Sequence, residues 1–171
     1  MRNNPSQPPH PSSQRGVWFP WAGIGALVLI GLIAVSRYNF LLFHTLAELF
    51  SIAVAWSLFM LVWNTRRFSQ NDALLSLGIA YFFVGLVDLL HTLAYKGMGI
   101  FAASWGANLP TQLWILGRYM ESAALLMFAI LQGRRLNALG LLAGWAGTTT
   151  IGLFAIFGWR SFPDCYIDGV G

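Results

Sequence analysis

The sequence predicts an all-α, polytopic integral membrane helical bundle with about five transmembrane helices. Its composition is the first reason: 57% of the 171 residues are hydrophobic and only 9% are charged, whereas soluble domains carry about 25% charged residues. The second is a series of long apolar runs, and the third is tryptophan near the ends of those runs, where indole suits the headgroup level. Such a chain has too little polar surface to face water, so lipid is its expected solvent.

Each apolar run is long enough to cross the roughly 30 Å of bilayer hydrocarbon at about 1.5 Å per residue. The predicted spans are residues 17–36, 40–63, 73–95, 111–133 and 136–158. Residues 1–16 precede them and are rich in Pro, Ser, Asn and Gln, a composition that predicts a disordered cytoplasmic segment.

The basic residues predict the orientation. If every run crosses, six arginines fall on the side of the amino terminus, and three basic residues fall on the other side. The first group is Arg2, Arg15, Arg66, Arg67, Arg134 and Arg135, and the second is Arg37, Lys96 and Arg160. The excess places the amino terminus in the cytoplasm. The tail SFPDCYIDGVG is then outside, and we expect the domain, residues 17–171, to be incomplete at its carboxyl end.

Several classes of function are excluded. The ten basic residues are spread in ones and twos, which is not a nucleic-acid-binding stripe. Cys165 is the single cysteine, so there is no internal disulfide and no multi-cysteine metal site. No phosphate-binding glycine loop, nucleophile elbow, kinase or cyclase motif is present. We therefore expect no catalytic residues and no enzyme activity in this segment.

The tetrapeptide HTLA occurs twice, and each copy lies beside an acidic residue within an apolar run. Glu48 follows His44 by four residues, and Asp88 precedes His91 by three; in the next run Glu121 follows Arg118 by three. Residues three or four apart share one face of a helix. A charge that faces lipid costs about 2.5–3.5 kcal/mol, so these faces are expected to turn inward.

Depth along the predicted spans groups the same residues. Measured from the outer face, the two histidines lie about 6 Å deep, Asp88 and Arg118 about 10 Å, Glu48 about 12 Å and Glu121 about 15 Å. The HTLA repeat is thus better interpreted as a shared depth than as a duplicated module. We predict one ligand-binding or signal-sensing site in the outer half of the bilayer, formed by His44, Glu48, Asp88, His91, Arg118 and Glu121.

Other interpretations of this cluster stay open. The pairs can act as interhelical contacts that only fix helix register. A proton-responsive histidine–carboxylate network is a second form of the sensing site. A metal ion is a less favoured option, because Arg118 opposes a cation and no HExxH or ExxH motif is present. Its ligands would be His44, His91, Glu48, Asp88 and Glu121; no cofactor is otherwise indicated. The loop 95–112 is either a lid above this site or an ordinary interfacial loop.

Five stretches resemble one known family: FLLFHTLAELFSIAVAW, WNTRRF, LGIAYFFVGLVDLLHTLAYKGMGIF, ANLPTQLWILGRYMES and FPDCYIDGVG. Over about residues 38–171 the chain is similar to the membrane-associated sensor domain, the third of the MASE types. The resemblance implies a multi-pass input domain of the bacterial inner membrane. It also implies output domains in cis on the cytoplasmic side, of the histidine-kinase or GGDEF type, in a two-component or cyclic-dinucleotide pathway.

The leading hypothesis is therefore a membrane sensory input domain. A proton-coupled transporter or channel is an alternative, although such a path needs polar residues through both halves of the bilayer and the inner half here offers almost none. A simple membrane anchor or dimerisation domain is the third, since glycine-rich helix faces suffice for it. The partners expected are the lipid bilayer, the output domains and a second copy of the chain in a homodimer, with no nucleic acid.

Overall fold

The computed structural model describes residues 15–68 and 71–166. It divides into two units, residues 1–44 and 45–171, and each is described by itself. Most of the segment predicted to be disordered, residues 1–14, lies outside the described residues; the helix α1 begins at Arg15. The prediction of an all-α membrane protein is confirmed: the described residues contain no strand, and five of their helices are long and apolar enough to cross a membrane.

The first unit contains α1 (Arg15–Tyr38) and the first turn of α2 (Phe40–Thr65). Asn39 separates the two helices, and its side-chain oxygen accepts a hydrogen bond from the backbone N–H of Leu42 at 3.0 Å. That bond satisfies one of the N–H groups that the first turn of a helix leaves without a partner. A new helix therefore starts at once after α1.

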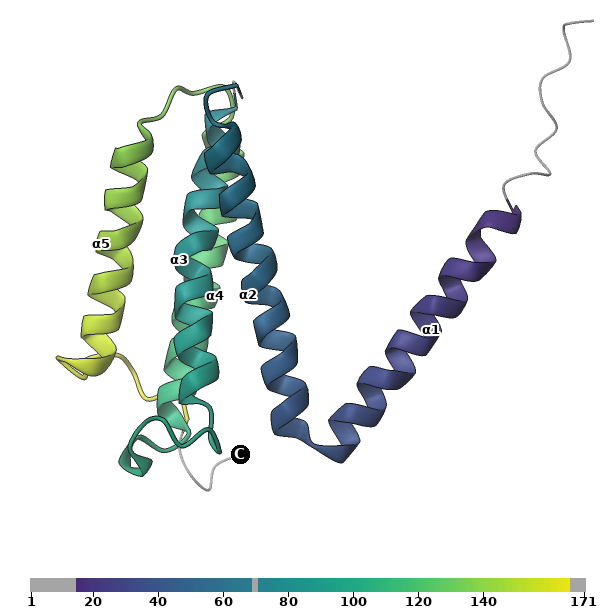
Figure 1. The fold of residues 1–171 in the computed structure, drawn as a ribbon. Coiled ribbons are helices and arrows are strands. Elements are labelled where there is room, and N and C mark those ends of the chain that lie inside the picture. The colour runs from purple at the N-terminus through teal and green to yellow at the C-terminus, as the bar shows by residue number, and fades with distance from the viewer. Residues whose placement is uncertain (1–14, 69–70, 167–171) are drawn as a thin grey trace, which may run out of the picture. The chain divides into compact units, whose positions relative to one another are not determined.

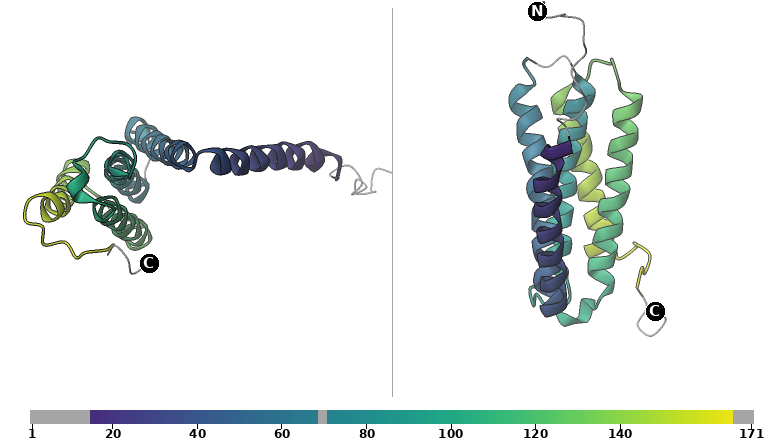
Figure 2. Two further views of the ribbon diagram at one scale, coloured as in Figure 1. Left: turned by 90° about the horizontal axis from the view of Figure 1, so that it is seen from below. Right: turned by 90° about the vertical axis from the view of Figure 1, so that its right-hand side faces the viewer.

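The second unit contains the rest of α2, then α3 (Asp72–Ala94), the short 3₁₀ helix η2 (Ala103–Trp105), α4 (Asn108–Ile130) and α5 (Ala138–Phe157). Figure 1 shows these long helices running alongside one another, and the left view of Figure 2 shows them end-on. More than half of the membrane-spanning stretch of α3 is buried, a larger share than in any other described span. The core is therefore built around α3.

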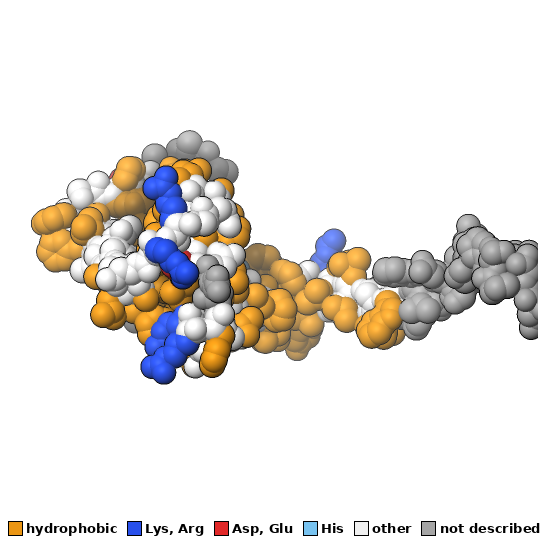
Figure 3. Space-filling model, turned by 90° about the horizontal axis from the view of Figure 1, so that it is seen from above, with side chains coloured by type: hydrophobic (Ala, Val, Ile, Leu, Met, Phe, Trp, Pro, Cys, Tyr) orange, Lys and Arg blue, Asp and Glu red, His pale blue; other side chains and the backbone are white. Residues whose placement is uncertain are grey.

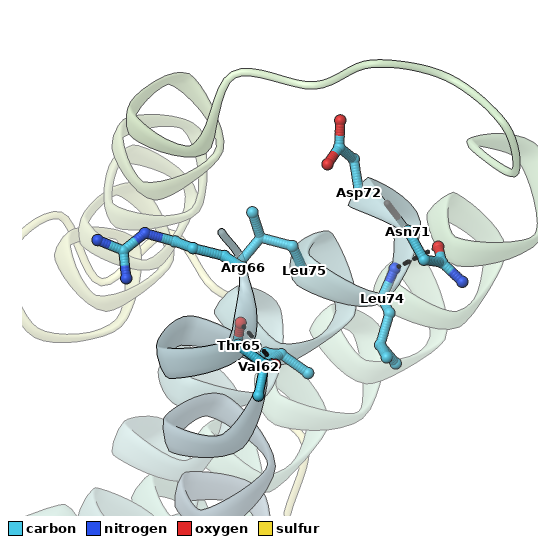
Figure 4. Close-up of a pocket in the computed structure, with 7 residues that line it drawn as sticks. All are labelled: Val62, Thr65, Arg66, Asn71, Asp72, Leu74 and Leu75. Carbon is cyan, nitrogen blue, oxygen red and sulfur yellow. Dashed lines mark hydrogen bonds between the residues drawn. The ribbon is translucent and has the colours of Figure 1, made fainter. Parts of the chain in front are cut away.

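Asparagine side chains start two of these helices. Asn71 accepts from the N–H of Leu74 at the start of α3, as Figure 4 shows. Asn137 accepts from the N–H groups of Leu139 and Gly140 at the start of α5. Both caps lie at the end of the unit that carries the loops α2–α3 and α4–α5, and they fix where the chain re-enters a helix.

Glycines bring the helices of the second unit together. A Cβ atom built on Gly78 of α3 would overlap the side chain of Val62 in α2, and one on Gly85 would lie 2.6 Å from the indole nitrogen of Trp56. That indole donates to the carbonyl of Phe82 at 3.3 Å. Between α5 and α4, a Cβ on Gly152 would lie 2.7 Å from the side chain of Leu116. Small residues at these positions permit the close approach that membrane helices rely on for packing.

Basic side chains mark one end of the second unit. Arg66 and Arg67 follow α2, and Arg134 and Arg135 lie between α4 and α5. Figure 3, which looks onto this end, shows blue side chains gathered there. Arg66 rests on the ring of Trp63, with its guanidinium carbon 4.1 Å from the centroid. At the same end Asp72 accepts a hydrogen bond from the N–H of Leu136 at 3.0 Å, which joins the start of α3 to the loop α4–α5.

Candidate functional site

Arg118 of α4 joins two carboxylates. Its Nη2 donates to both carboxylate oxygens of Asp88 in α3, at 3.0 Å each, and its Nη1 donates to Glu121 at 2.6 Å. The Asp88 side chain is only 7% exposed, against 40% for Arg118 and 29% for Glu121. The pair with the buried Asp88 therefore links α3 to α4, whereas the pair with the more exposed Glu121 lies within α4.

Local sequence makes room for this contact. Gly117 precedes Arg118, and a Cβ atom at Gly117 would lie 3.0 Å from an Asp88 carboxylate oxygen. The absence of a side chain there lets α4 pass close to Asp88. Glu121 is then held from a second side, because the phenol of Tyr81 donates to its other oxygen at 3.2 Å. Tyr81 precedes Asp88 by seven residues, two turns of α3, so the two share one face.

His91 connects α3 with the start of α4 and with α2. Its Nδ1 lies 2.8 Å from the carbonyl oxygen of Pro110. Because a carbonyl can only accept, Nδ1 must carry the proton. The other ring nitrogen, Nε2, lies 3.9 Å from Glu48. The imidazole therefore contacts the start of α4 through one ring nitrogen and lies beside the Glu48 carboxylate of α2 on the other side.

The two groups of contacts are neighbours, because Asp88 and His91 lie three residues apart on one face of α3. One donor in the network, the Nε–H of Arg118, is buried and has no hydrogen-bond acceptor among the described residues. A donor of this kind in a polar cluster is free to serve a ligand or a water molecule.

The structure thus brings together five of the six residues predicted as a site: Glu48, Asp88, His91, Arg118 and Glu121. His44 lies in the first turn of α2, which belongs to the other unit, and its ring stacks on Phe40 with centroids 6.2 Å apart. Of the residues in the metal option, Asp88 and Glu121 are both occupied by the guanidinium of Arg118.

Sequence reasoning missed Tyr81 and the carbonyl of Pro110. The seven-residue spacing from Tyr81 to Asp88 was a usable signal, whereas a backbone carbonyl carries none.

The sequence also gave no indication of the contacts that the segment after α5 makes with α4. Asn108 accepts from the N–H groups of Cys165 and Tyr166 and donates to Asp164, and Gln112 donates to the carbonyls of Phe162 and Pro163.

The tail contacts fix the segment after α5 against the first turns of α4. Gln112 is 6% exposed, so its amide needs the partners it finds there. The thiol of Cys165 lies in this segment, and burial, followed by the negative charge of Asp164, raises its pKa above the ordinary value.

A comparison with known protein families identifies the family of this chain. The model of the membrane-associated sensor domain, MASE3, matches residues 35–171. The chain belongs to the MASE3 family. No curated protein and no solved structure matches it. Family membership and the five apolar helices make the segment a multi-pass membrane sensor domain with a sensory input role, a role that calls for no catalytic activity in this segment.

Proposed function

We propose that this MASE3 domain is the input module of a bacterial histidine kinase or diguanylate cyclase and detects its stimulus in the outer half of the inner membrane. The observation that carries the proposal is the network centred on Arg118, which ties α3 to α4 through a buried carboxylate. Charges are costly in a membrane interior and usually mark functional positions there. The excess of arginines at the opposite end supports an amino terminus in the cytoplasm.

The network suits a two-state element. Arg118 divides its donors between Asp88 on α3 and Glu121 on its own helix, so a ligand that competes for the donors facing Asp88 loosens α3 from α4 and leaves the pairing within α4 in place. His91 adds a second link between α3 and α4 through Pro110. A stimulus that prefers one set of pairings shifts the population of helix arrangements, and cytoplasmic domains in cis receive that shift.

Six residues form the proposed sensing site. They are the five joined in the second unit together with His44, which lies one helical turn before Glu48 on α2. The bilayer, the output domains in cis and a second copy of the chain are the partners we propose.

Substitution of the network in the full-length protein tests this function. We expect His91→Ala and Glu121→Ala to change the basal output in native membranes at least fivefold, measured as autophosphorylation or cyclic-dinucleotide formation. Two tyrosines give a matched pair of variants. Tyr81→Phe removes the phenol that holds Glu121, whereas Tyr119→Phe removes a phenol from an α4 side chain that is 69% exposed.

Only Tyr81→Phe should alter the output. Wild-type output from His91→Ala, Glu121→Ala and Tyr81→Phe, at normal expression levels, would show that the network only holds the helices together. The sensing proposal would then fail.

A further inference from the structure

The loop between α3 and α4 encloses a cavity of about 370 Å³. This size lies in the range of small-molecule sites, which are mostly apolar with a few polar groups that orient the ligand. Most of the cavity wall comes from the loop itself, and the rest comes from the last turn of α3 and the first turn of α4. The lining includes Tyr95, Lys96, Phe101, Trp105 and Leu109.

The aromatic wall of this cavity is held in place from behind. The rings of Phe101 and Trp105 both pack on Phe157 at the end of α5, with centroids 5.9 Å and 5.6 Å apart. Backbone bonds tighten the loop, since the N–H of Met98 donates to Tyr95 and that of Trp105 to Ala102, each at 3.1 Å. The cavity is therefore formed by contacts within the chain.

Glycine permits the loop to follow this path. Gly97, Gly99 and Gly106 have φ angles of 108°, 69° and 57° and all line the cavity. Residues with side chains rarely adopt such angles. The three glycines therefore shape the wall of the cavity.

Charge indicates what the cavity would bind. Among the described residues that line it, Lys96 is the one charged side chain and none is a carboxylate. A second cation, Arg160, lies over the ring of Trp105 with its guanidinium carbon 4.8 Å from the centroid. Asp164 lines a neighbouring cavity that shares Trp105, where it accepts from Asn108. A site with aromatic walls and one ammonium group is complementary to an aromatic ligand with one negative charge.

We propose that this cavity binds a small aromatic carboxylate, whose ring packs among Tyr95, Phe101 and Trp105 and whose carboxylate pairs with Lys96. The inference rests on the proposed sensory function and supplies the chemical class of its stimulus.

The cavity is connected to the network by Tyr95. This side chain lines the cavity, and its ring meets the ring of His91 edge-on, with centroids 6.3 Å apart and planes at 78°. Leu109, also in the lining, directly precedes Pro110, whose carbonyl oxygen holds His91. An occupant therefore contacts residues on both sides of the bond between His91 and Pro110, and can influence the link between α3 and α4.

Titration of the whole chain in lipid nanodiscs tests the inference. The probes are phenylacetate, neutral 2-phenylethanol and cationic 2-phenylethylamine, with empty nanodiscs as the reference for partitioning into lipid. We expect saturable binding of phenylacetate by calorimetry, and binding of the other two at least tenfold weaker. Lys96→Met should weaken phenylacetate binding at least tenfold. Arg37→Met, which removes an exposed cation outside the lining, should leave the affinity unchanged.

Two outcomes would overturn the inference: no saturable binding of phenylacetate, or equal affinity in the wild type and Lys96→Met. Neither outcome affects the test of the network, which measures output and not binding. Conversely, binding that depends on Lys96 would stand even if the network variants showed wild-type output.

Discussion

At the scale of single residues, the most consequential side chain is Arg118. Its guanidinium pairs with two carboxylates, Asp88 and Glu121. Asp88 is the more deeply buried of the two, and an unpaired charge is costly in a buried position. A buried ion pair is weak evidence for stability in itself, but removal of one partner is destabilising because the other charge is left alone. Arg118 is therefore the residue at which the network can be opened with the clearest effect.

Arg118→Met should lower the free energy of unfolding by about 2 kcal/mol. This is less than the about 3–5 kcal/mol typical of a fully buried pair, because protein leaves 40% of the Arg118 side chain uncovered. Denaturation in mixed detergent micelles, followed by circular dichroism, measures the loss. The double variant Arg118→Met, Asp88→Asn should recover part of it, because the deeply buried charge on α3 is removed while Glu121 still lacks its cation. An equally unstable double variant would contradict this explanation.

The sequence identified the members of this network that carry charge, since residues three or four apart on apolar helices must share a face and avoid lipid. It could not identify which groups pair. Whether Asp88 meets Arg118 or His91 depends on the rotation of α4 against α3, which Gly117 and its neighbours set through packing. Whether the loop 95–112 acts as a lid or is an ordinary interfacial loop stays a prediction; in the structure, residues from Tyr95 to Ala107 line a cavity beside His91.

At the scale of elements, α3 is the helix of the second unit on which its neighbours pack, and glycines determine how close they come. Gly78 and Gly85 both face side chains of α2, so the distance between these two helices depends on the absence of a Cβ atom at each. The same dependence is absent at Gly144 of α5, where an added Cβ meets no atom within 4 Å. These three positions therefore form a natural comparison.

Gly78→Ala should destabilise the second unit by about 1–3 kcal/mol, the usual cost of overpacking, since its methyl group would overlap Val62. Combined with Val62→Ala, which removes the obstructing methyl groups, it should be partly restored. Gly144→Ala is the control and should be neutral or slightly stabilising. Thermal unfolding in detergent ranks the variants. Equal melting temperatures for Gly78→Ala and Gly144→Ala would contradict the packing described.

The helices could be predicted because long apolar runs leave little choice of structure in lipid. Their ends were harder to predict. The fourth run was expected to begin at residue 111, but α4 begins at Asn108. Proline is tolerated in the first turn of a helix, where N–H groups lack intrahelical partners, so Pro110 does not delay the start. Asn137, in turn, starts α5 two residues later than the run of apolar residues suggested.

At the scale of the whole molecule, the distribution of arginines predicts how the second unit lies in the bilayer. The loops α2–α3 and α4–α5 carry Arg66, Arg67, Arg134 and Arg135, and the loop α3–α4 at the other end carries Lys96. The proposed orientation places the first pair of loops in the cytoplasm and the cavity-forming loop outside.

Cysteine labelling of intact cells checks this orientation. In a Cys165→Ser background, Ser104→Cys in the loop α3–α4 should react with a membrane-impermeant maleimide. Phe68→Cys, at an exposed position after α2, should react only once the membrane is permeabilised. The reverse pattern would invert the topology and place the candidate site in the cytoplasmic half of the bilayer.

The attachments of α4 have a mechanical consequence. At one end its first turns are tied to the tail by Asn108 and Gln112, and at the other the N–H of Leu136, six residues past the helix, is bonded to Asp72. A helix that is held at both ends resists translation along its axis, such as the one-turn shift of about 5.4 Å seen in some switches. Any movement that α4 transmits is therefore expected to keep its register along α3.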